Sequence, residues 1–357
     1  MSFSANLKTI LNRLLISEED RREYTKDALC IQNQVMEKLE NADSTFKKAY
    51  DGLSLGGSYL DRVKLGTPDE FDLHLKLKFP FQITPVADEK GFVYLRAPNG
   101  YNQFVSYCGY ISRDKLQSWL RTVFNRVFGA YNYLDVTSSS SGRVYRVKYT
   151  LDGQGCAHSI EAKCGNRIIE FDIVPAFEFV ESQWPWPLSD LKVSKKERGN
   201  YSWLAVPQKK RGDNDDRTFL VCAAQWEREY MKRQDNLKNV LRLMKGLRDK
   251  QNPDRPNAGL PHLTSYMIKT VILQELPKIN WQQDEGTLLL KMWNCLVNYL
   301  DAGHLAFFWA DDKNVFDRMS NDQLRICRIN SKKVLDKLRD PRIQNSLDDL
   351  SNLFDLN

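Results

Sequence analysis

The chain has 357 residues and a formal net charge of +6, with 42% hydrophobic and 27% charged residues. This composition is ordinary for a globular protein, and the length suits one bilobal domain or two modest ones. The mild positive charge permits a polyanionic partner without requiring one. No apolar run approaches the length of a membrane span, and the start MSFSANLKTI lacks the apolar core of a signal peptide. We therefore expect neither a membrane partner nor secretion.

Cysteine usage points to a reducing compartment. The seven cysteines are odd in number and scattered, and no CxxC pair occurs among them. This pattern favours free thiols over a disulfide framework. We expect a cytoplasmic protein.

The first 50 residues carry a helical pattern. Apolar residues recur at helical spacing from Leu7 to Leu15, and Ser17 followed by Glu-Glu-Asp begins a long amphipathic segment. Neither proline nor glycine interrupts residues 3–50. We therefore expect a long helical leading segment, whose mixed basic and acidic residues are typical of a solvated face.

The segment GGSYLDRVKLGTPDEFDLHLKLKF starts with the small turn Gly56-Gly57-Ser58 and continues as a polar loop, residues 59–69. Residues 70–79 then alternate between polar and apolar side chains, which predicts a half-buried strand. Side chains two apart on a strand point the same way, so Glu70 and Asp72 lie side by side. Two carboxylates after a Gly-Gly-Ser turn suggest a site for divalent metal and phosphate.

A third carboxylate follows later in the chain. Residues 80–103 are predicted as loops, 112–129 as a helix that ends at Gly129, and 143–151 as a strand. Residues 158–164 and 167–179 are predicted as two strands joined by a hairpin turn at Gly165-Asn166. Asp172 lies in the second of these strands among apolar neighbours, where an unpaired charge would be costly. This placement favours a functional role over a solvent-facing one.

The pattern changes near residue 182. A stiff segment with Trp184 and Trp186 leads to a basic loop region, and helical patterns follow. They cover residues 218–232, 236–250, 262–276, 284–302, 312–318 and 320–339, and no strand-like alternation of any length interrupts them. We expect an N-terminal core over residues 1–182 and a C-terminal helical lobe over 183–357.

Glu70, Asp72 and Asp172 on adjacent strands suit hard cations, which bind carboxylates together with substrate phosphates. Two such ions can assist an in-line displacement at phosphorus. A Gly57-Ser58 turn lets the backbone approach a triphosphate closely. The pattern indicates nucleotidyl transfer, and the competing interpretation is a charged surface strand beside an ordinary turn.

The same residues resemble a known family. GGSYLDRVKLGTPDEFDLHLKL, IIEFDIVPAFEF, WLAVP, LRLMKGL and HLTSYMIKT are similar, in this order, to segments of the cyclic GMP-AMP synthase-like receptors. These receptors are Mab-21-type nucleotidyltransferases that make cyclic dinucleotides when they sense double-stranded nucleic acid. The resemblance implies an α+β bilobal nucleotidyltransferase fold. It has a mixed β-sheet core, a long N-terminal spine helix and a C-terminal helical lobe.

The resemblance also implies residue roles. Gly57 and Ser58 form the phosphate-binding turn, and Glu70, Asp72 and Asp172 hold two Mg²⁺ or Mn²⁺ ions, with Asp172 helping to deprotonate the attacking hydroxyl. Lys245 and Ser265 are expected to contact phosphates, and Tyr266 to stack on a nucleobase. The implied substrates are ATP and GTP, and the implied setting is antiviral innate immunity. Taken singly, Lys245 could be a solvated helix lysine and Tyr266 a core aromatic residue.

Two departures from the family pattern matter. The interval KRQDNLKN has neither cysteine nor histidine where vertebrate cyclic GMP-AMP synthase carries a zinc-binding insertion, so we expect no zinc. That insertion helps to recognise DNA, so the ligand expected here is double-stranded RNA rather than DNA. The usual Trp-Arg-x-Ser-Phe-Ser segment is replaced by RTFLVCAA, beginning at Arg217. This leaves open the bases and the linkage of the product, and dimerisation of ligand-bound chains is also left open.

The expected RNA surface combines the leading helix with the basic loop region. Its candidate residues are Arg22, Lys26, Lys47, Lys48, Lys195, Lys196, Lys209, Lys210 and Arg211. RNA would be recognised by shape and phosphate, and its binding would order the loop 59–69 and align Glu70 with Asp72. The alternative is that these lysines are merely solvated, which we prefer for the cluster from Arg325 to Lys333.

Two further functions remain open. A Mab-21 protein can keep the fold and act as a structural or interaction protein, although the three acids favour activity. A template-independent polymerase of the poly(A) or oligoadenylate type shares the Gly-Ser and acid pattern, but HLTSYMIKT points away from it.

Overall fold

A computed structural model of the chain describes residues 2–65, 69–98, 103–129, 133–153, 155–232, 234–249, 260 and 262–356. The chain forms two compact units. We call Ser17–Asp61 with Thr67–Trp226 the sheet unit, and Met1–Ile16, Arg62–Gly66 and Glu227–Asn357 the helical unit. Among the helices that the structure describes, none is both long enough and apolar enough to cross a membrane.

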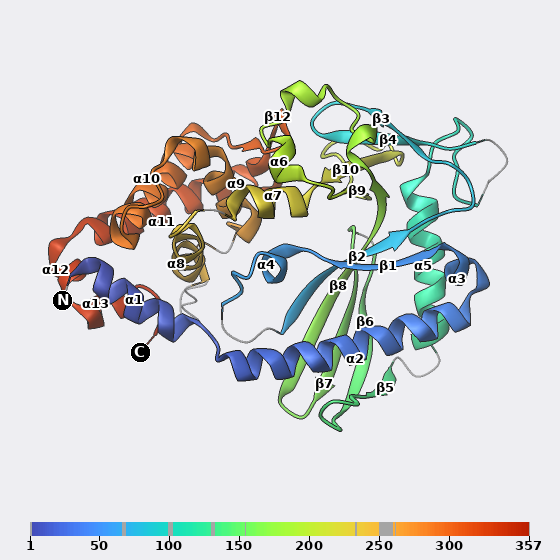
Figure 1. Cartoon of the computed structure of the whole chain (residues 1–357), viewed down its shortest axis with the longest axis horizontal. Coiled ribbons are helices and arrows are strands. Elements are labelled where there is room, and N and C mark those ends of the chain that lie inside the picture. The colour runs from blue at the N-terminus through green and yellow to red at the C-terminus, as the bar shows by residue number, and fades with distance from the viewer. Residues whose placement is uncertain are drawn as a thin grey trace. The chain divides into compact units, whose positions relative to one another are not determined.

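The sheet unit contains a ten-stranded sheet (Figure 1). Eight of its strands follow the order β3-β4-β10-β9-β8-β7-β6-β5, while β1 pairs with β2 and β2 pairs with β8. The strands are β1 (Tyr50–Leu55), β2 (Glu70–Leu77), β3 (Thr84–Ala87), β4 (Phe92–Arg96), β5 (Leu134–Thr137), β6 (Val144–Asp152), β7 (His158–Cys164), β8 (Arg167–Phe179), β9 (Trp203–Val206) and β10 (Thr218–Cys222).

Strand β8 joins the two parts of this sheet. Its first part runs antiparallel to β7 and parallel to β2, and its last residues, Phe177 to Phe179, pair with β9. The turn at Gly165, which has a φ of +58°, connects β7 to β8 as the sequence predicts. Residues Glu170 to Ile173 pair with β2 on one side and with β7 on the other, so the position of Asp172 is fixed by neighbours on both sides.

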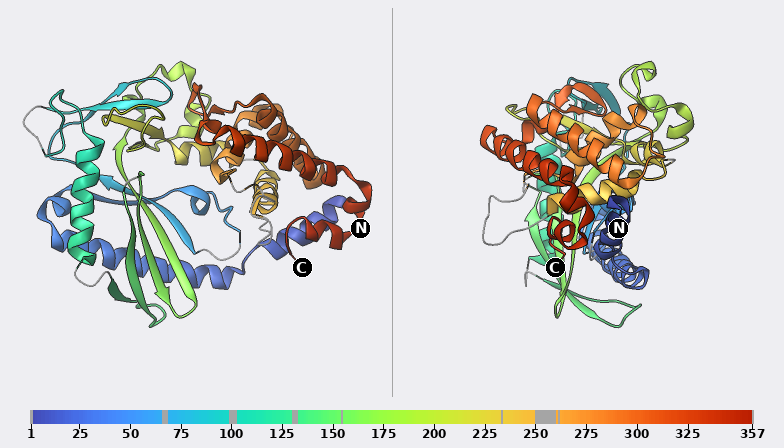
Figure 2. Two further views of the ribbon diagram at one scale, coloured as in Figure 1. Left: turned by 180° about the vertical axis from the view of Figure 1, so that it is seen from behind. Right: turned by 90° about the vertical axis from the view of Figure 1, so that its left-hand side faces the viewer.

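Two long helices pack on one face of the sheet. Helix α2 (Glu18–Ala42) crosses the strands and α5 (Arg113–Phe128) lies beside it (Figures 1 and 2). The ring of Phe124 on α5 stacks on Tyr149 and His158, with centroids 5.0 and 4.9 Å apart. Polar residues of β2 and β8, among them Asp72 and Asp172, lie on the opposite sheet face.

Capping residues set the helix boundaries. The side chain of Ser17 accepts a hydrogen bond from the backbone of Asp20 and begins α2, as predicted. At the other end, the Asp43 N–H donates to the carbonyl of Leu39, and its carboxylate caps α3 (Ser44–Ala49). The leading segment is therefore divided at Asp43, where the sequence shows no proline or glycine. The remaining helices of the sheet unit are α4 (Gly57–Leu60), η1 (Glu181–Gln183), η2 (Leu188–Asp190) and α6 (Lys195–Arg198).

The helical unit is built around α10, which packs against α1, α8, α9 and α11. Its elements are α1 (Phe3–Leu14), α8 (Leu237–Asp249), α9 (Ser265–Glu275), η3 (Leu276–Lys278), α10 (Glu285–Ala302), β11 (Ala306–Phe307), β12 (Ala310–Asn314), η4 (Val315–Arg318), α11 (Asn321–Arg339), α12 (Pro341–Asn345) and α13 (Leu347–Asn352). Helix α7 (Ala224–Met231) spans the boundary between the units.

The α+β class, with its mixed sheet, long leading helix and helical C-terminal region, is confirmed. The helix predicted over 218–232 is wrong in its first part, because Thr218–Cys222 forms β10. Strands β9 and β10 join the sheet, so the sheet unit extends to Trp226 and not to residue 182. Helix α1 likewise belongs to the helical unit rather than to the N-terminal core.

Candidate active site

The two acidic strands lie side by side in parallel. Strand β2 pairs with β8 so that Glu70 is opposite Glu170 and Asp72 is opposite Asp172. Between these pairs, Phe71 and Phe171 point to the core and stack with ring centroids 5.5 Å apart. The hydrophobic alternation therefore fixes the register that places the carboxylates together on the other face.

Three carboxylates converge at this place. One carboxylate oxygen from each of Glu70, Asp72 and Asp172 lies within 4.8 Å of the other two. Glu70 is exposed and both aspartates are half-buried, so the group is open to solvent on one side. The hydroxyl of Ser159, directly opposite on β7, donates a hydrogen bond to Asp172 Oδ1. Clustered oxygen donors of this kind fit Mg²⁺ or Mn²⁺, and the structure brings together the three acids that the sequence singles out.

The Gly56-Gly57 turn lies against the same carboxylates. The Gly56 N–H donates to the carbonyl of Asp72 at 2.8 Å, and Gly57 has a φ of +56°. A Cβ at position 57 would lie 1.6 Å from Asp72 Oδ2, so only glycine fits there without displacing the carboxylate. The side chain of Ser58 and residues 66–68 of the predicted switch loop lie outside the described part of the chain.

The imidazole of His74 packs against this turn at Gly56. A Cβ at position 56 would lie 2.7 Å from His74 Cε1, which shows how closely the imidazole packs under Gly56. Burial lowers the pKa of His74 to about 4, so the ring is neutral at pH 7. The alternation of residues 70–79 predicts only a solvent-facing polar side chain at this position.

Glu170 is a fourth carboxylate on this face of the sheet. Burial raises the pKa of Glu170, and the neighbouring charges of Glu161 and Glu70 raise it further. The three predicted acids therefore belong to a larger negative field, which would attract divalent cations. The spacing Glu170-x-Asp172 repeats that of Glu70-x-Asp72, and this was the signal in the sequence.

Comparison with known proteins identifies the fold that holds these acids. A family model described as the Mab-21 protein nucleotidyltransferase domain matches residues 59–231. A second, the Mab-21 protein HhH/H2TH-like domain, matches residues 236–333. The chain belongs to the Mab-21 nucleotidyltransferase family. Together the two matches cover the segments that carry the resemblance found in the sequence, apart from the turn Gly56-Gly57-Ser58, which precedes the first match.

Relatives of this Mab-21 protein are similar over nearly its full length. A cyclic GMP-AMP synthase-like protein of Drosophila melanogaster is 50% identical over 339 residues, which cover 95% of this chain and 94% of that protein. A cyclic GMP-AMP synthase-like receptor of Drosophila eugracilis is 35% identical, with 90% and 87% covered. Another such receptor, from Aethina tumida, is 28% identical, with 85% and 80% covered.

The other predicted nucleotide contacts lie in the helical unit of the Mab-21 protein. The Lys245 ammonium on α8 is buried and donates to the carbonyl of Val63 at 2.9 Å. Ser265, the first residue of α9, accepts a hydrogen bond from Arg248 at 2.6 Å. Lys245 is thus not a solvated helix lysine, and its charge already interacts with the loop that follows Arg62.

Tyr266 has a partner that the sequence did not reveal. Its hydroxyl donates to Glu227 Oε1 at 3.1 Å, and Trp309 Nε1 donates to the same oxygen at 2.8 Å. The buried Glu227 also pairs with Lys269 at 2.9 Å. The tyrosine ring is therefore held at its polar end and is only half-buried.

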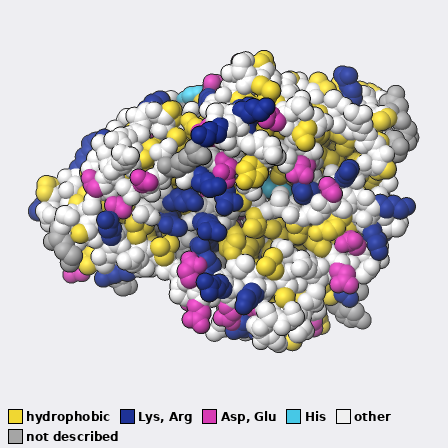
Figure 3. Space-filling model, in the orientation of Figure 1, with side chains coloured by type: hydrophobic (Ala, Val, Ile, Leu, Met, Phe, Trp, Pro, Cys, Tyr) yellow, Lys and Arg dark blue, Asp and Glu magenta, His cyan; other side chains and the backbone are white. Residues whose placement is uncertain are grey.

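The predicted RNA contacts differ in exposure. All of them are exposed except Lys210, which is 9% exposed and pairs with Asp88 at 2.5 Å. Figure 3 shows Lys and Arg side chains in groups on one face, with Asp and Glu among them. We remove Lys210 from the proposed surface, because its ammonium already forms an ion pair within the sheet unit.

Proposed function

We propose that this Mab-21 protein is a metal-dependent nucleotidyltransferase that joins ATP and GTP into a cyclic dinucleotide of the cyclic GMP-AMP type. The observation that supports it is the convergence of Glu70, Asp72 and Asp172 beside the Gly57 turn. The names of the relatives, cyclic GMP-AMP synthase-like protein and receptor, support the product class. We further propose a role in antiviral innate immunity.

Each residue of the site has a chemical task in this reaction. A ribose hydroxyl oxygen attacks the α-phosphorus of a triphosphate, the bond to the β-phosphate oxygen breaks, and pyrophosphate leaves. Asp172, oriented by Ser159, takes part in removing the hydroxyl proton. Gly57 lets the backbone approach the phosphates, since no Cβ stands there. Two Mg²⁺ or Mn²⁺ ions bound by the three carboxylates would neutralise charge on the phosphates and lower the pKa of the attacking hydroxyl.

Lys245, Ser265 and Tyr266 complete the proposal. We assign Lys245 and Ser265 to phosphate groups and Tyr266 to a nucleobase, in keeping with the family resemblance. The Lys245 ammonium is presently bonded to Val63, so nucleotide would have to compete with the carbonyl of that loop residue. The hydrogen bond from Tyr266 to Glu227 would hold the ring ready for stacking.

Double-stranded RNA is the proposed activator. The exposed residues Arg22, Lys26, Lys47 and Lys48 come from α2 and α3, and Lys195, Lys196, Lys209 and Arg211 come from the basic loop region. Phosphate contacts of this kind read no sequence and weaken with salt. All seven cysteines are free thiols in the structure, which supports the proposed cytoplasmic setting.

One incubation separates the competing functions. The protein is mixed with Mn²⁺ or Mg²⁺, labelled ATP and GTP, and double-stranded RNA, double-stranded DNA or neither, and the products are chromatographed. A cyclic dinucleotide supports the proposal, a ladder of oligonucleotides supports a polymerase, and no product under any condition supports a structural Mab-21 protein. Replacing Asp72 or Asp172 by Asn should abolish the product, and retained activity in both variants would refute the metal assignment.

A further inference from the structure

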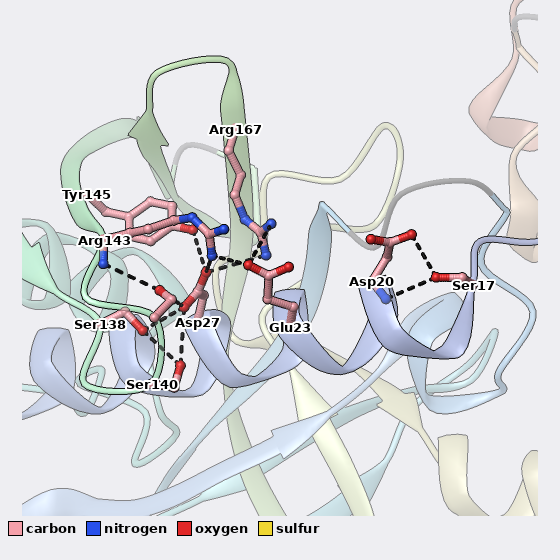
Figure 4. Close-up of polar contacts among 10 residues, drawn as sticks. Ser17, Asp20, Glu23, Asp27, Ser138, Ser140, Arg143, Tyr145 and Arg167 are labelled. Carbon is pink, nitrogen blue, oxygen red and sulfur yellow. Dashed lines mark hydrogen bonds and ion pairs between the residues drawn. The ribbon is translucent and has the colours of Figure 1, made fainter.

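A buried aspartate on α2 gathers charged and hydroxyl groups from a distant part of the chain. Asp27 is 0% exposed, although it lies on a helix whose neighbouring residue Lys26 is exposed. Figure 4 shows side chains from the segment 138–145 and from the start of β8 pointing at its carboxylate. The hydroxyls of Ser138, Ser141 and Tyr145 donate hydrogen bonds to it at 2.6, 2.6 and 2.7 Å. The Arg143 guanidinium donates at 3.2 Å, and the Arg167 guanidinium forms an ion pair with it at 3.3 Å.

The Asp27 carboxylate is ionised in this setting. Burial raises the pKa of Asp27, but the hydrogen bonds from Ser138, Ser141 and Tyr145 and the charge of Arg167 outweigh it and bring the pKa below its ordinary value. Removing one partner of a buried charge lowers stability, while the remaining hydrogen bonds and ion pairs still hold their own segments. The contact therefore fixes the position of each donor segment relative to α2.

One of these ion-pair partners lies at the start of the strand that carries Asp172. Arg167 is the first residue of β8, and the same strand carries Asp172. The Arg167 guanidinium lies over the ring of Tyr24, with its carbon 3.4 Å from the ring centroid, and also faces Glu23 at 3.7 Å. The start of β8 is thus held by contacts with Glu23, Tyr24 and Asp27, which lie within about one and a half turns of α2.

The same stretch of α2 also contacts the glycine turn. The hydroxyl of Thr25 forms a hydrogen bond with the hydroxyl of Tyr59 in α4. The Tyr59 ring then packs on Phe71, with centroids 4.7 Å apart, and Phe71 lies between Glu70 and Asp72 in β2. Residues 23–27 therefore contact both segments that build the carboxylate site, one through Asp27 and one through Thr25.

We propose that Asp27 is a positioning residue for the carboxylate site: it holds β8 against α2 so that Asp172 stands at the correct place beside Asp72. It acts through Arg167 and the strand that follows. The activity measurement for this inference rests on the proposed function, whereas the Mn²⁺-binding measurement does not.

The test compares three variants of the full chain. Asp27→Asn removes the central charge with little change of shape, and Arg167→Met removes the link to β8. Arg143→Met is the matched control, because Arg143 also pairs with Asp27 and Glu23 but belongs to the turn before β6. Each variant is measured for Mn²⁺ affinity by calorimetry without nucleotide, for kcat and KM with RNA, and for Tm.

We expect Asp27→Asn and Arg167→Met to weaken Mn²⁺ binding and to lower kcat by about 10-fold or more, as loss of an outer partner does at other metal sites. The KM for nucleotide should change by less than about threefold, because substrate contacts are untouched. Arg143→Met should lower Tm to a similar extent and keep Mn²⁺ affinity and kcat.

Two results would overturn the inference: wild-type Mn²⁺ affinity in a folded Arg167→Met protein, or equal losses of affinity in Arg143→Met and Arg167→Met. If Asp27→Asn does not fold, the pair of arginine variants decides the matter. A wild-type protein that binds Mn²⁺ but makes no dinucleotide would refute the proposed function and leave the Mn²⁺ comparison valid.

Discussion

Gly57 lies so close to Asp72 that a Cβ at position 57 would be 1.6 Å from Asp72 Oδ2. The turn and the Asp72 carboxylate therefore pack directly against each other, and a shift of one would displace the other. This relationship explains why a small, flexible turn stands before the acidic strand.

A single methyl group at this turn should abolish activity. We expect Gly57→Ala to lower kcat/KM by about 100-fold or more, because the carboxylate must shift by an ångström or so. The control is Gly165→Ala, since Gly165 has a similar φ of +58° but nothing within 4 Å of its Cβ position. Both variants carry the backbone penalty of about 1–2 kcal/mol, and only the first carries the clash. Equal activities in the two variants would show that the clash is relieved elsewhere.

The raised pKa of Glu170 predicts how its carboxylate changes the stability of the fold with pH. Because the folded protein raises this pKa, the ionised carboxylate disfavours folding, and the penalty is present at neutral pH and absent below the unfolded value of about 4.3. In the presence of EDTA, Glu170→Gln should raise Tm at pH 7 by on the order of 1 °C and have no effect near pH 3.5.

Glu178→Gln, on the same strand, is the matched control for Glu170. Glu178 pairs with Lys76 at 3.2 Å, so its loss should lower Tm or leave it unchanged. Melting curves of both variants at several pH values check the two signs, and a lower Tm for Glu170→Gln at pH 7 would contradict the repulsion argued here.

The buried ammonium of Lys245 should matter for triphosphate binding. In an Asp172→Asn background, in which we expect no turnover, Lys245→Met should weaken ATP binding by about 10- to 100-fold, the usual range for a charged hydrogen bond. Lys238→Met on the same helix removes an equal charge and should leave ATP affinity nearly unchanged. Calorimetric titration with ATP distinguishes the two, and equal affinities would remove Lys245 from the site.

The RNA surface predicts a contrast between two charge reversals. The double variant Arg22→Glu/Lys26→Glu should weaken binding of double-stranded RNA by about 10-fold or more and flatten the salt dependence by about one unit of slope per lost contact. Arg325→Glu/Lys333→Glu changes the net charge equally but alters the cluster that we interpret as solvated. Filter binding over a salt series measures both, and equal losses would indicate attraction by net charge alone.

The sequence predicted the elements that have one buried and one solvent-exposed face. The alternation of residues 70–79 and the polar-apolar pattern around Asp172 predicted β2, β8 and their acids. Strands β9 and β10 were missed because their residues are buried on both sides, as in Trp203–Val206, and such runs have no period of two.

Long-range contacts of single side chains could not be predicted. Asp27 lies in an amphipathic helix and its burial depends on Ser138, 111 residues away. The neutral state of His74 likewise depends on its packing beneath the glycine turn, which alternation alone does not show. Asp27 and His74 were both expected to face solvent, but each is covered by residues from another segment of the chain.

The stacked pair Phe71 and Phe171 has a consequence for which insertions and deletions this chain can accept. A slip of β2 by one residue against β8 would turn Asp72 into the core and bring Phe71 out into water. An insertion or deletion within β2 that displaced the acids would thus also disrupt the core and prevent folding. Single-residue insertions should be tolerated in the loop before Glu70, whereas insertions within Glu70–Leu77 should prevent folding. A folded but inactive chain would therefore arise by replacement of an acid and not by a change of strand register.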